Sequence, residues 1–115
     1  MNFFDALNAH AAWKQRLVRH LEDPAGHPIS AAAAGRPDQC ALGRWLAAHG
    51  DDHAQLGALQ EAHAALHRAV EAVVQAAADD PVAARRLLEG QFVPASVKLQ
   101  KLLRALAVAG LKQAG

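Results

Sequence analysis

Histidine and cysteine are the residues of this chain whose types and spacing could do chemistry. The chain has seven histidines and a single cysteine, Cys40. Two histidines, His63 and His67, are four residues apart, and in a helix this spacing brings both imidazoles to one side, where they can share one metal ion. A third, His10, lies within an apolar stripe near the N-terminus. Three imidazoles and one thiolate make a complete set of four metal ligands.

A mixed set of nitrogen and sulfur ligands favours zinc, which takes four of them in a tetrahedron, whereas magnesium and calcium prefer oxygen. Each residue alone is a weak signal. A His-x-x-x-His pair arises by chance on an alanine-rich helix, a lone histidine on an apolar face is commonly bonded to a carbonyl group, and a free cysteine is commonly a small buried residue. We predict one zinc site because all four side chains can point into one core.

The elements that must position these residues are predicted to be helices. Apolar residues at spacings of three and four predict a first helix from Asn2, its N-cap, to Leu21. Prolines and glycines in residues 23–36 predict a long loop, in which the alanines 31–34 allow a loose turn. Pro37 predicts the start of a short second helix that ends near Ala48 and carries the cysteine in its first turn or just after it.

The second half of the chain is also predicted to be helical. A third helix starts at Asp51 or Asp52 and runs to about Ala78, with the histidine pair in its apolar stripe. Asp80 and Pro81 are predicted to cap a fourth helix, residues 81–89. Gly90 and Pro94 separate it from a last helix, residues 95–111, unless these two residues kink one long helix. The positions of the last helix predicted to face inward are Leu99, Leu102, Leu103, Leu106 and Gly110.

Length and composition agree with one helical domain, residues 1–115. The chain has 115 residues, of which 52% are hydrophobic and only 4% aromatic. Much of the apolar content is alanine, which favours helices, whereas strands prefer β-branched and aromatic residues. We therefore predict an all-α fold: a four-helix-bundle-like domain with an additional short helix that carries the cysteine ligand.

Charge and hydropathy exclude several kinds of partner. The formal net charge is +1 and the charges are interspersed, so neither nucleic acid nor an anionic membrane surface is expected as a partner. The chain has no apolar stretch of transmembrane length, and its N-terminus does not resemble a signal peptide. A single cysteine excludes an internal disulfide, which favours a cytoplasmic location.

Three motifs resemble the chemoreceptor zinc-binding domain family. That family has a histidine with tryptophan three residues later, then Cys-x-Leu-Gly-x-Trp, then His-x-x-x-His. The sequence contains all three motifs in this order, and Ser96 and Leu102 resemble the family's downstream pattern. The matching segments are His10-Ala-Ala-Trp13-Lys14, Cys40-Ala-Leu-Gly43-Arg44-Trp45 and His63-Ala-Ala-Leu-His67.

The resemblance implies a function as well as a site. It implies that His10, Cys40, His63 and His67 hold zinc, and that the zinc-bound thiolate of Cys40 senses an oxidant such as hypochlorous acid, or that the domain senses zinc itself. It further implies a homodimer that regulates a chemoreceptor or diguanylate cyclase module in bacterial chemotaxis or cyclic-di-GMP signalling. The sequence does not identify which of these outputs the domain controls.

Other residues are expected to support the site or to play no part in it. Trp13, Gly43 and Trp45 are predicted to pack around the site, with the tryptophans either simply filling the core or also shielding the metal. Asp38 and Glu61 are candidate hydrogen-bond partners for the histidine rings, and the alternative for both is a surface carboxylate. The remaining histidines, His20, His27, His49 and His53, are assigned no role.

Three other functions fit the sequence less well than a zinc-binding domain. An enzyme is not expected, because four protein ligands leave no open position on zinc, and Ala64 stands where a zinc protease has glutamate. A di-iron bundle needs inward-facing carboxylates. A haem bundle would give the purified protein a visible absorption band. A metal-free interaction bundle, including a phosphotransfer module, would need an exposed histidine instead of buried ones.

Overall fold

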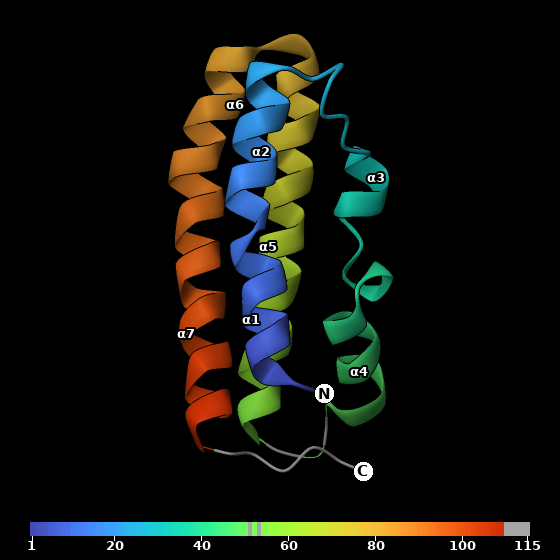
Figure 1. Cartoon of the computed structure of the whole chain (residues 1–115), viewed down its shortest axis with the longest axis vertical. Helices are drawn as coiled ribbons and strands as arrows, with labels where there is room; N and C mark the ends of the chain where they lie inside the picture. The colour runs from blue at the N-terminus through green and yellow to red at the C-terminus, as the bar shows by residue number, and fades with distance from the viewer. Residues whose placement is uncertain (51, 53, 110–115) are drawn as a thin grey trace.

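A computed structural model describes residues 1–50, 52 and 54–109, and within these residues the chain forms helices and no strands (Figure 1). Asp51, one of the two predicted starts of the third helix, lies outside the described residues. So do His53 and the predicted inward position Gly110. The all-α, bundle-like fold that the sequence predicts is confirmed.

The first helical rod consists of α1 (Phe3–Ala11) and α2 (Trp13–Glu22). Its N-cap is Asn2, as predicted, whose side chain accepts hydrogen bonds from the backbone N–H groups of Phe4 and Asp5 at 2.9 and 3.1 Å. The two helices meet at Ala12, which keeps helical dihedral angles (φ −68°, ψ −19°). The predicted helix is therefore one rod with a local irregularity two residues after His10.

The long helix α5 (Ala54–Asp79) has 26 residues and carries the predicted histidine pair. It begins two residues after Asp52, the later of the two predicted starts. Its buried face follows the predicted stripe at helical spacing, which places apolar residues on both sides of the histidines. The buried members are Leu56, Leu59, Ala62, His63, Leu66, His67, Ala69, Val70, Val73 and Val74.

The last rod runs through α6 (Pro81–Leu87), the π-helical turn η2 (Leu88–Phe92) and α7 (Val93–Ala109). Asp80 caps it, as predicted, by accepting from the N–H groups of Val82 and Ala83, both at 3.1 Å. Of the two predicted alternatives, one long helix is correct, because a π-helical turn joins the two segments that Gly90 was expected to separate. In η2 the Val93 N–H bonds to the Leu88 carbonyl, five residues back, just before a proline that has no N–H to donate.

A column of short segments runs alongside α5: α3 (Ala31–Ala34), the 3-10 turn η1 (Pro37–Gln39) and α4 (Ala41–His49). The loose turn predicted at 31–34 is a single helical turn, capped by the side chain of Ser30. The predicted start of the second helix was wrong by four residues. Pro37 opens the 3-10 turn instead, and Cys40, with extended dihedral angles (φ −111°, ψ 161°), is the N-cap of α4.

The three rods pack side by side, and the column of α3 and α4 occupies the fourth position of the bundle (Figure 1). The short cysteine-bearing helix thus belongs to this column and is not an addition to four complete helices. None of the described helices is long and apolar enough to cross a membrane. The most completely buried side chains of the core are Leu17, Leu42, Leu56, Leu59, Leu66, Val70, Val73, Phe92, Leu99 and Leu103.

Candidate metal centre

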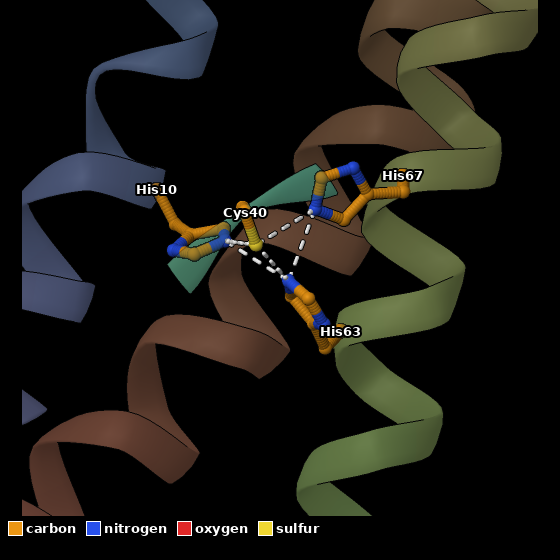
Figure 2. A group of neighbouring side chains, drawn as sticks. All are labelled: His10, Cys40, His63 and His67. Atoms are coloured by element: carbon orange, nitrogen blue, oxygen red, sulfur yellow. Dashed lines mark hydrogen bonds between the residues drawn. The ribbon is translucent and has the colours of Figure 1, made fainter. Parts of the chain in front are cut away.

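All four predicted ligand residues meet between α1, α5 and the α3–α4 column (Figure 2). The last turn of α1 supplies His10, α5 supplies His63 and His67, and the junction of η1 and α4 supplies Cys40. The three imidazoles are buried, with exposed fractions of 4%, 1% and 3%, and the cysteine is half-buried. We call these four residues the ligand cluster.

The ligand atoms of the cluster face one another at nearly the separations that a tetrahedral zinc site requires. His63 Nε2 lies 3.1 Å from His10 Nε2 and 3.0 Å from His67 Nε2. The Cys40 sulfur lies 3.1 Å from His63 Nε2, 3.8 Å from His67 Nε2 and 3.9 Å from His10 Nε2. Tetrahedral zinc with bonds of about 2.0–2.3 Å places neighbouring ligand atoms about 3.3–3.6 Å apart.

Backbone carbonyl groups orient two of the imidazoles. His10 Nδ1 donates to the Ala6 carbonyl at 2.7 Å, one helical turn back, and His67 Nδ1 donates to the Ala34 carbonyl at 2.7 Å. A carbonyl can only accept, so each Nδ1 carries the proton and each Nε2 presents a bare lone pair to the centre of the cluster. The second bond also ties α3 to α5.

Burial keeps the imidazoles neutral. Desolvation, followed by the repulsion of the neighbouring imidazoles, lowers the pKa of His63 to about 3. Burial also lowers the pKa of His10 and of His67, although their bonds to carbonyl groups act in the opposite direction. The Nε2 atoms of His10 and His67 are both acceptors and cannot satisfy each other, and the only protons available to them are those of the His63 ring and the Cys40 thiol. A cation at the centre would satisfy them all, so the cluster is suited to holding zinc.

Local geometry explains why glycine follows the cysteine by three residues. The Gly43 N–H donates to the Cys40 sulfur at 3.4 Å, which makes the sulfur the capping acceptor of α4. A Cβ atom at Gly43 would lie only 2.6 Å from the Pro37 carbonyl carbon, so η1 can fold this closely onto α4 only over a glycine. The predicted supporting role of Gly43 therefore acquires a physical reason.

The two tryptophans differ in what they contact. Trp13 is half-buried beside the cluster, with its ring centroid 6.5 Å from that of His67. Trp45 packs edge-on against Phe3 at 5.5 Å and lies over His49 at 5.1 Å. Its indole N–H is buried without a hydrogen-bond partner in the part of the chain that the structure describes. Trp13 thus borders the site, whereas Trp45 anchors α4 on α1.

The two carboxylates considered as partners of the histidines lie elsewhere, so the alternative of surface carboxylates is correct. Asp38 pairs with Arg36 at 3.0 Å, and Glu61 is exposed on the side of α5 that faces α7. Backbone carbonyl groups take their place. Neither carbonyl group was predicted as a partner from the sequence. The one at Ala6 is predictable, because it stands four residues before His10 in a helix.

The remaining described histidines lie outside the cluster. His20 is buried and its Nδ1 bonds to the carbonyl of His27 at 2.9 Å. His49 is paired with Asp52 at 3.2 Å, and His53 lies outside the described residues. Within the described residues, only the ligand cluster brings three or more potential metal ligands together.

Comparison with known proteins agrees with the site. The sequence pattern of the chemoreceptor zinc-binding domain matches residues 10–74, a segment that begins at the first ligand and includes the other three. No curated protein and no solved structure matches the chain significantly.

Proposed function

The chain belongs to the chemoreceptor zinc-binding domain family, and from this premise we propose that it is a regulatory domain that binds one zinc ion through His10, Cys40, His63 and His67. We further propose that the thiolate of Cys40 is the part of the site that responds to an oxidant such as hypochlorous acid.

One observation carries the zinc site: three buried imidazole nitrogens and one sulfur, from three separate elements, converge within 4.8 Å of one another. Two of the nitrogens are fixed as acceptors by carbonyl groups on the far side of their rings. The cluster contains no carboxylate, which argues against a di-iron site. Four protein ligands also leave no position for a substrate, which fits a family that regulates and does not catalyse.

The position of Cys40 supports a role in sensing. Zinc keeps a bound thiol in the thiolate form, which is the reactive one. The sulfur attacks the chlorine of hypochlorous acid, so that an S–Cl bond forms as the Cl–O bond breaks and hydroxide leaves. Water then displaces chloride and releases a proton, which leaves a sulfenic acid.

Oxidation at this sulfur changes two contacts at once. The sulfenic acid is a poorer metal ligand than the thiolate, and the same sulfur accepts the hydrogen bond of Gly43 at the start of α4. Loss of both contacts would free η1 and α4 to move against α5. This movement is the signal that we propose the domain passes on.

The proposed setting follows the family. We propose that the domain acts in the bacterial cytoplasm as a homodimer and controls a chemoreceptor or a diguanylate cyclase, and so chemotaxis or cyclic-di-GMP signalling. Zinc itself is the alternative stimulus. The two differ in a simple way, because a zinc sensor responds to chelation without any oxidation of the cysteine.

Metal analysis tests the proposal. Purified, reduced protein is expected to contain one zinc per chain, and hypochlorous acid is expected to release it while the cysteine is oxidised. Cys40→Ala should lose zinc affinity by more than the roughly 10–100-fold cost of removing an outer hydrogen-bond partner, and should give no response to the oxidant. His27→Gln, at an exposed histidine outside the cluster, is the matched control and should retain zinc.

Two outcomes would contradict the proposal. Purified protein without zinc, or with a visible absorption band from haem or iron, would contradict the zinc site. Zinc release by hypochlorous acid that is unchanged in Cys40→Ala would contradict the redox role of Cys40 but not the zinc site.

A further inference from the structure

A cleft leads from the surface to Cys40. It has a volume of about 270 Å³ and lies between the α1–α2 rod and the segment from α3 to the cysteine. Its inner wall holds the buried rings of His10 and His67 beside the sulfur, and exposed arginines form its rim. We call this space the Cys40 cleft. Its volume is at the lower end of small-molecule sites, so it fits a small ligand and not a protein segment.

The Cys40 cleft presents positive charge. Two guanidinium groups, those of Arg16 and Arg36, line it, and no carboxylate of the described residues does. Trp13 holds Arg16 in place, because the guanidinium carbon lies 3.9 Å from the centre of the indole ring. The remaining lining is the Trp13 ring and three alanines, which offer an apolar surface for a short aliphatic chain.

Arg36 is partly neutralised. Its Nε and Nη2 atoms donate to the two carboxylate oxygens of Asp38 at 3.3 and 3.0 Å. Asp38 does not line the Cys40 cleft but borders a separate cavity beside Gly43. Arg16 therefore supplies most of the positive charge at the rim, and the carboxylate of Asp38 limits what Arg36 adds.

Cys40 has no second cysteine to react with among residues 1–115, so a sulfenic acid formed there finds no partner thiol within this domain. The sulfur is half-buried, and the Cys40 cleft gives a small molecule access to it. Residues 1–115 therefore supply no resolving thiol, and the Cys40 cleft is the route by which a small thiol from another molecule reaches the sulfur.

We propose that the Cys40 cleft selects an anionic low-molecular-weight thiol, a cysteine-containing peptide or acid with free carboxylates, which resolves oxidised Cys40 as a mixed disulfide. This inference rests on the proposed redox function. The carboxylates of the ligand pair with Arg16 and Arg36, and this places its sulfur against Cys40. The two guanidinium groups thus determine which thiols reset the sensor.

Resolution of the Cys40 sulfenic acid consumes two molecules of the thiol and needs no further oxidant. The thiolate of the ligand attacks the sulfur of the Cys40 sulfenic acid, an S–S bond forms and the S–O bond breaks. The hydroxide that leaves takes up the proton of the incoming thiol and becomes water. A second molecule of the ligand then attacks the mixed disulfide, releases Cys40 as a thiol and departs as its own disulfide.

Competition between thiols of different charge tests the inference. Zinc-loaded protein is treated with hypochlorous acid, and then with glutathione, neutral 2-mercaptoethanol or cationic cysteamine, while intact mass follows the mixed disulfide. The wild type should react fastest with glutathione after correction for intrinsic thiol reactivity. The double variant Arg16→Gln, Arg36→Gln should lose this preference, roughly tenfold, since a cleft lined by charges of one sign raises the on-rate of oppositely charged ligands by tenfold or more.

Two further variants sharpen the test. Asp38→Asn should raise the preference for glutathione, because it removes the counter-charge of Arg36 and leaves the rest of the cleft intact. The pair Lys101→Gln, Arg104→Gln is the matched control. Both residues are exposed on α7, on the opposite side of the bundle from α3, so the preference should not change (Figure 1). Equal zinc content in all variants confirms that each is folded.

The outcomes separate this inference from the function on which it rests. A sulfenic acid that forms, as trapped with dimedone, but reacts with all three thiols without regard to charge overturns the inference alone. Absence of zinc or of any sulfenic acid overturns the proposed function and the inference with it. A glutathione preference that persists in the arginine double variant shows that the cleft is not what selects the thiol.

Discussion

Gly43 and the carbonyl group of Pro37 are packed so closely that no side chain fits between them: a Cβ atom on the glycine would lie 2.6 Å from the carbonyl carbon. This approach folds η1 onto the first turn of α4. It also directs the Gly43 N–H at the Cys40 sulfur, at 3.4 Å. The position of the sulfur in the ligand cluster thus depends on a residue that binds no metal.

Gly43→Ala is therefore expected to weaken zinc binding although alanine favours helices. The new methyl group forces η1 or α4 to move, and the sulfur moves with it. We expect zinc affinity to fall by roughly 10–100-fold, the range found when outer contacts of a metal site are removed. Competition with a zinc chelator measures this change.

Gly57→Ala is the matched control for that experiment. Gly57 is an exposed position of α5 where a Cβ atom meets nothing within 4 Å. Alanine should stabilise the helix there by about 0.5–1 kcal/mol and leave zinc affinity unchanged. Equal zinc affinity in the two variants would show that the contact between η1 and α4 does not position the sulfur.

The metal-free protein is expected to lose stability as the pH falls below about 6.5. The pKa of His63 is lowered to about 3 in the folded chain, and those of His10 and His67 are lowered too. Between the unfolded and folded pKa values the unfolded chain binds more protons, so acid favours unfolding. Each imidazole protonated only on unfolding removes about 1.4 kcal/mol per pH unit.

Urea unfolding of chelated protein at several pH values from 7 to 5 tests this dependence, because most carboxylates are still ionised in that range. His63→Gln should flatten the slope, and Gly57→Ala, which changes no titratable group, should leave the slope unchanged. A free energy of unfolding that is constant from pH 7 to pH 5 would mean that the imidazoles are not shielded from protons in the folded chain.

The parts of the fold that the sequence predicted are those with local causes. Asn2 and Asp80 cap their helices, as their side chains and positions indicated. The histidine pair follows from the spacing of four on one helix, and an apolar stripe carried His10 into the core. In each case residues within a few positions of one another determine the structure.

The parts that could not be predicted depend on contacts between distant segments. Pro37 is a good helix start, but the close contact of η1 with Gly43 makes it open a 3-10 turn, and Cys40 becomes the cap. The Ala34 carbonyl that orients His67 belongs to a single helical turn, too short for any periodicity. No sequence pattern announces such an acceptor, because every residue has a carbonyl group.

Asp80→Ala should lower stability without affecting the metal site. Asp80 accepts two backbone N–H groups at the start of α6, and losing an N-cap costs about 1 kcal/mol, or about 4 °C in melting temperature. Asp79→Ala removes the neighbouring charge, which caps no helix, and should have a smaller effect. Thermal unfolding measures both variants, and a drop in zinc affinity in Asp80→Ala would contradict the separation of cap and site.

Removal of zinc is expected to loosen the column of α3, η1 and α4 more than the three rods. The column has helices of only four and nine residues, too short to be stable alone, and its buried apolar side chains are Ala34, Leu42 and Leu46. Its links to the cluster are the Cys40 sulfur and the bond from His67 to the Ala34 carbonyl. The rods, in contrast, share a continuous core.

Amide hydrogen exchange with and without a zinc chelator measures this difference. Zinc at 1,000 times its dissociation constant stabilises the bound state by about 4 kcal/mol, so exchange in residues 31–49 should quicken by up to roughly 10³-fold on chelation. Amides around Val70 and Leu99 should change far less. Cys40→Ala with zinc present should reproduce this pattern, because it removes the ligand that the column contributes. Exchange that quickens equally in all helices would mean that the metal holds the whole bundle together and not this column in particular.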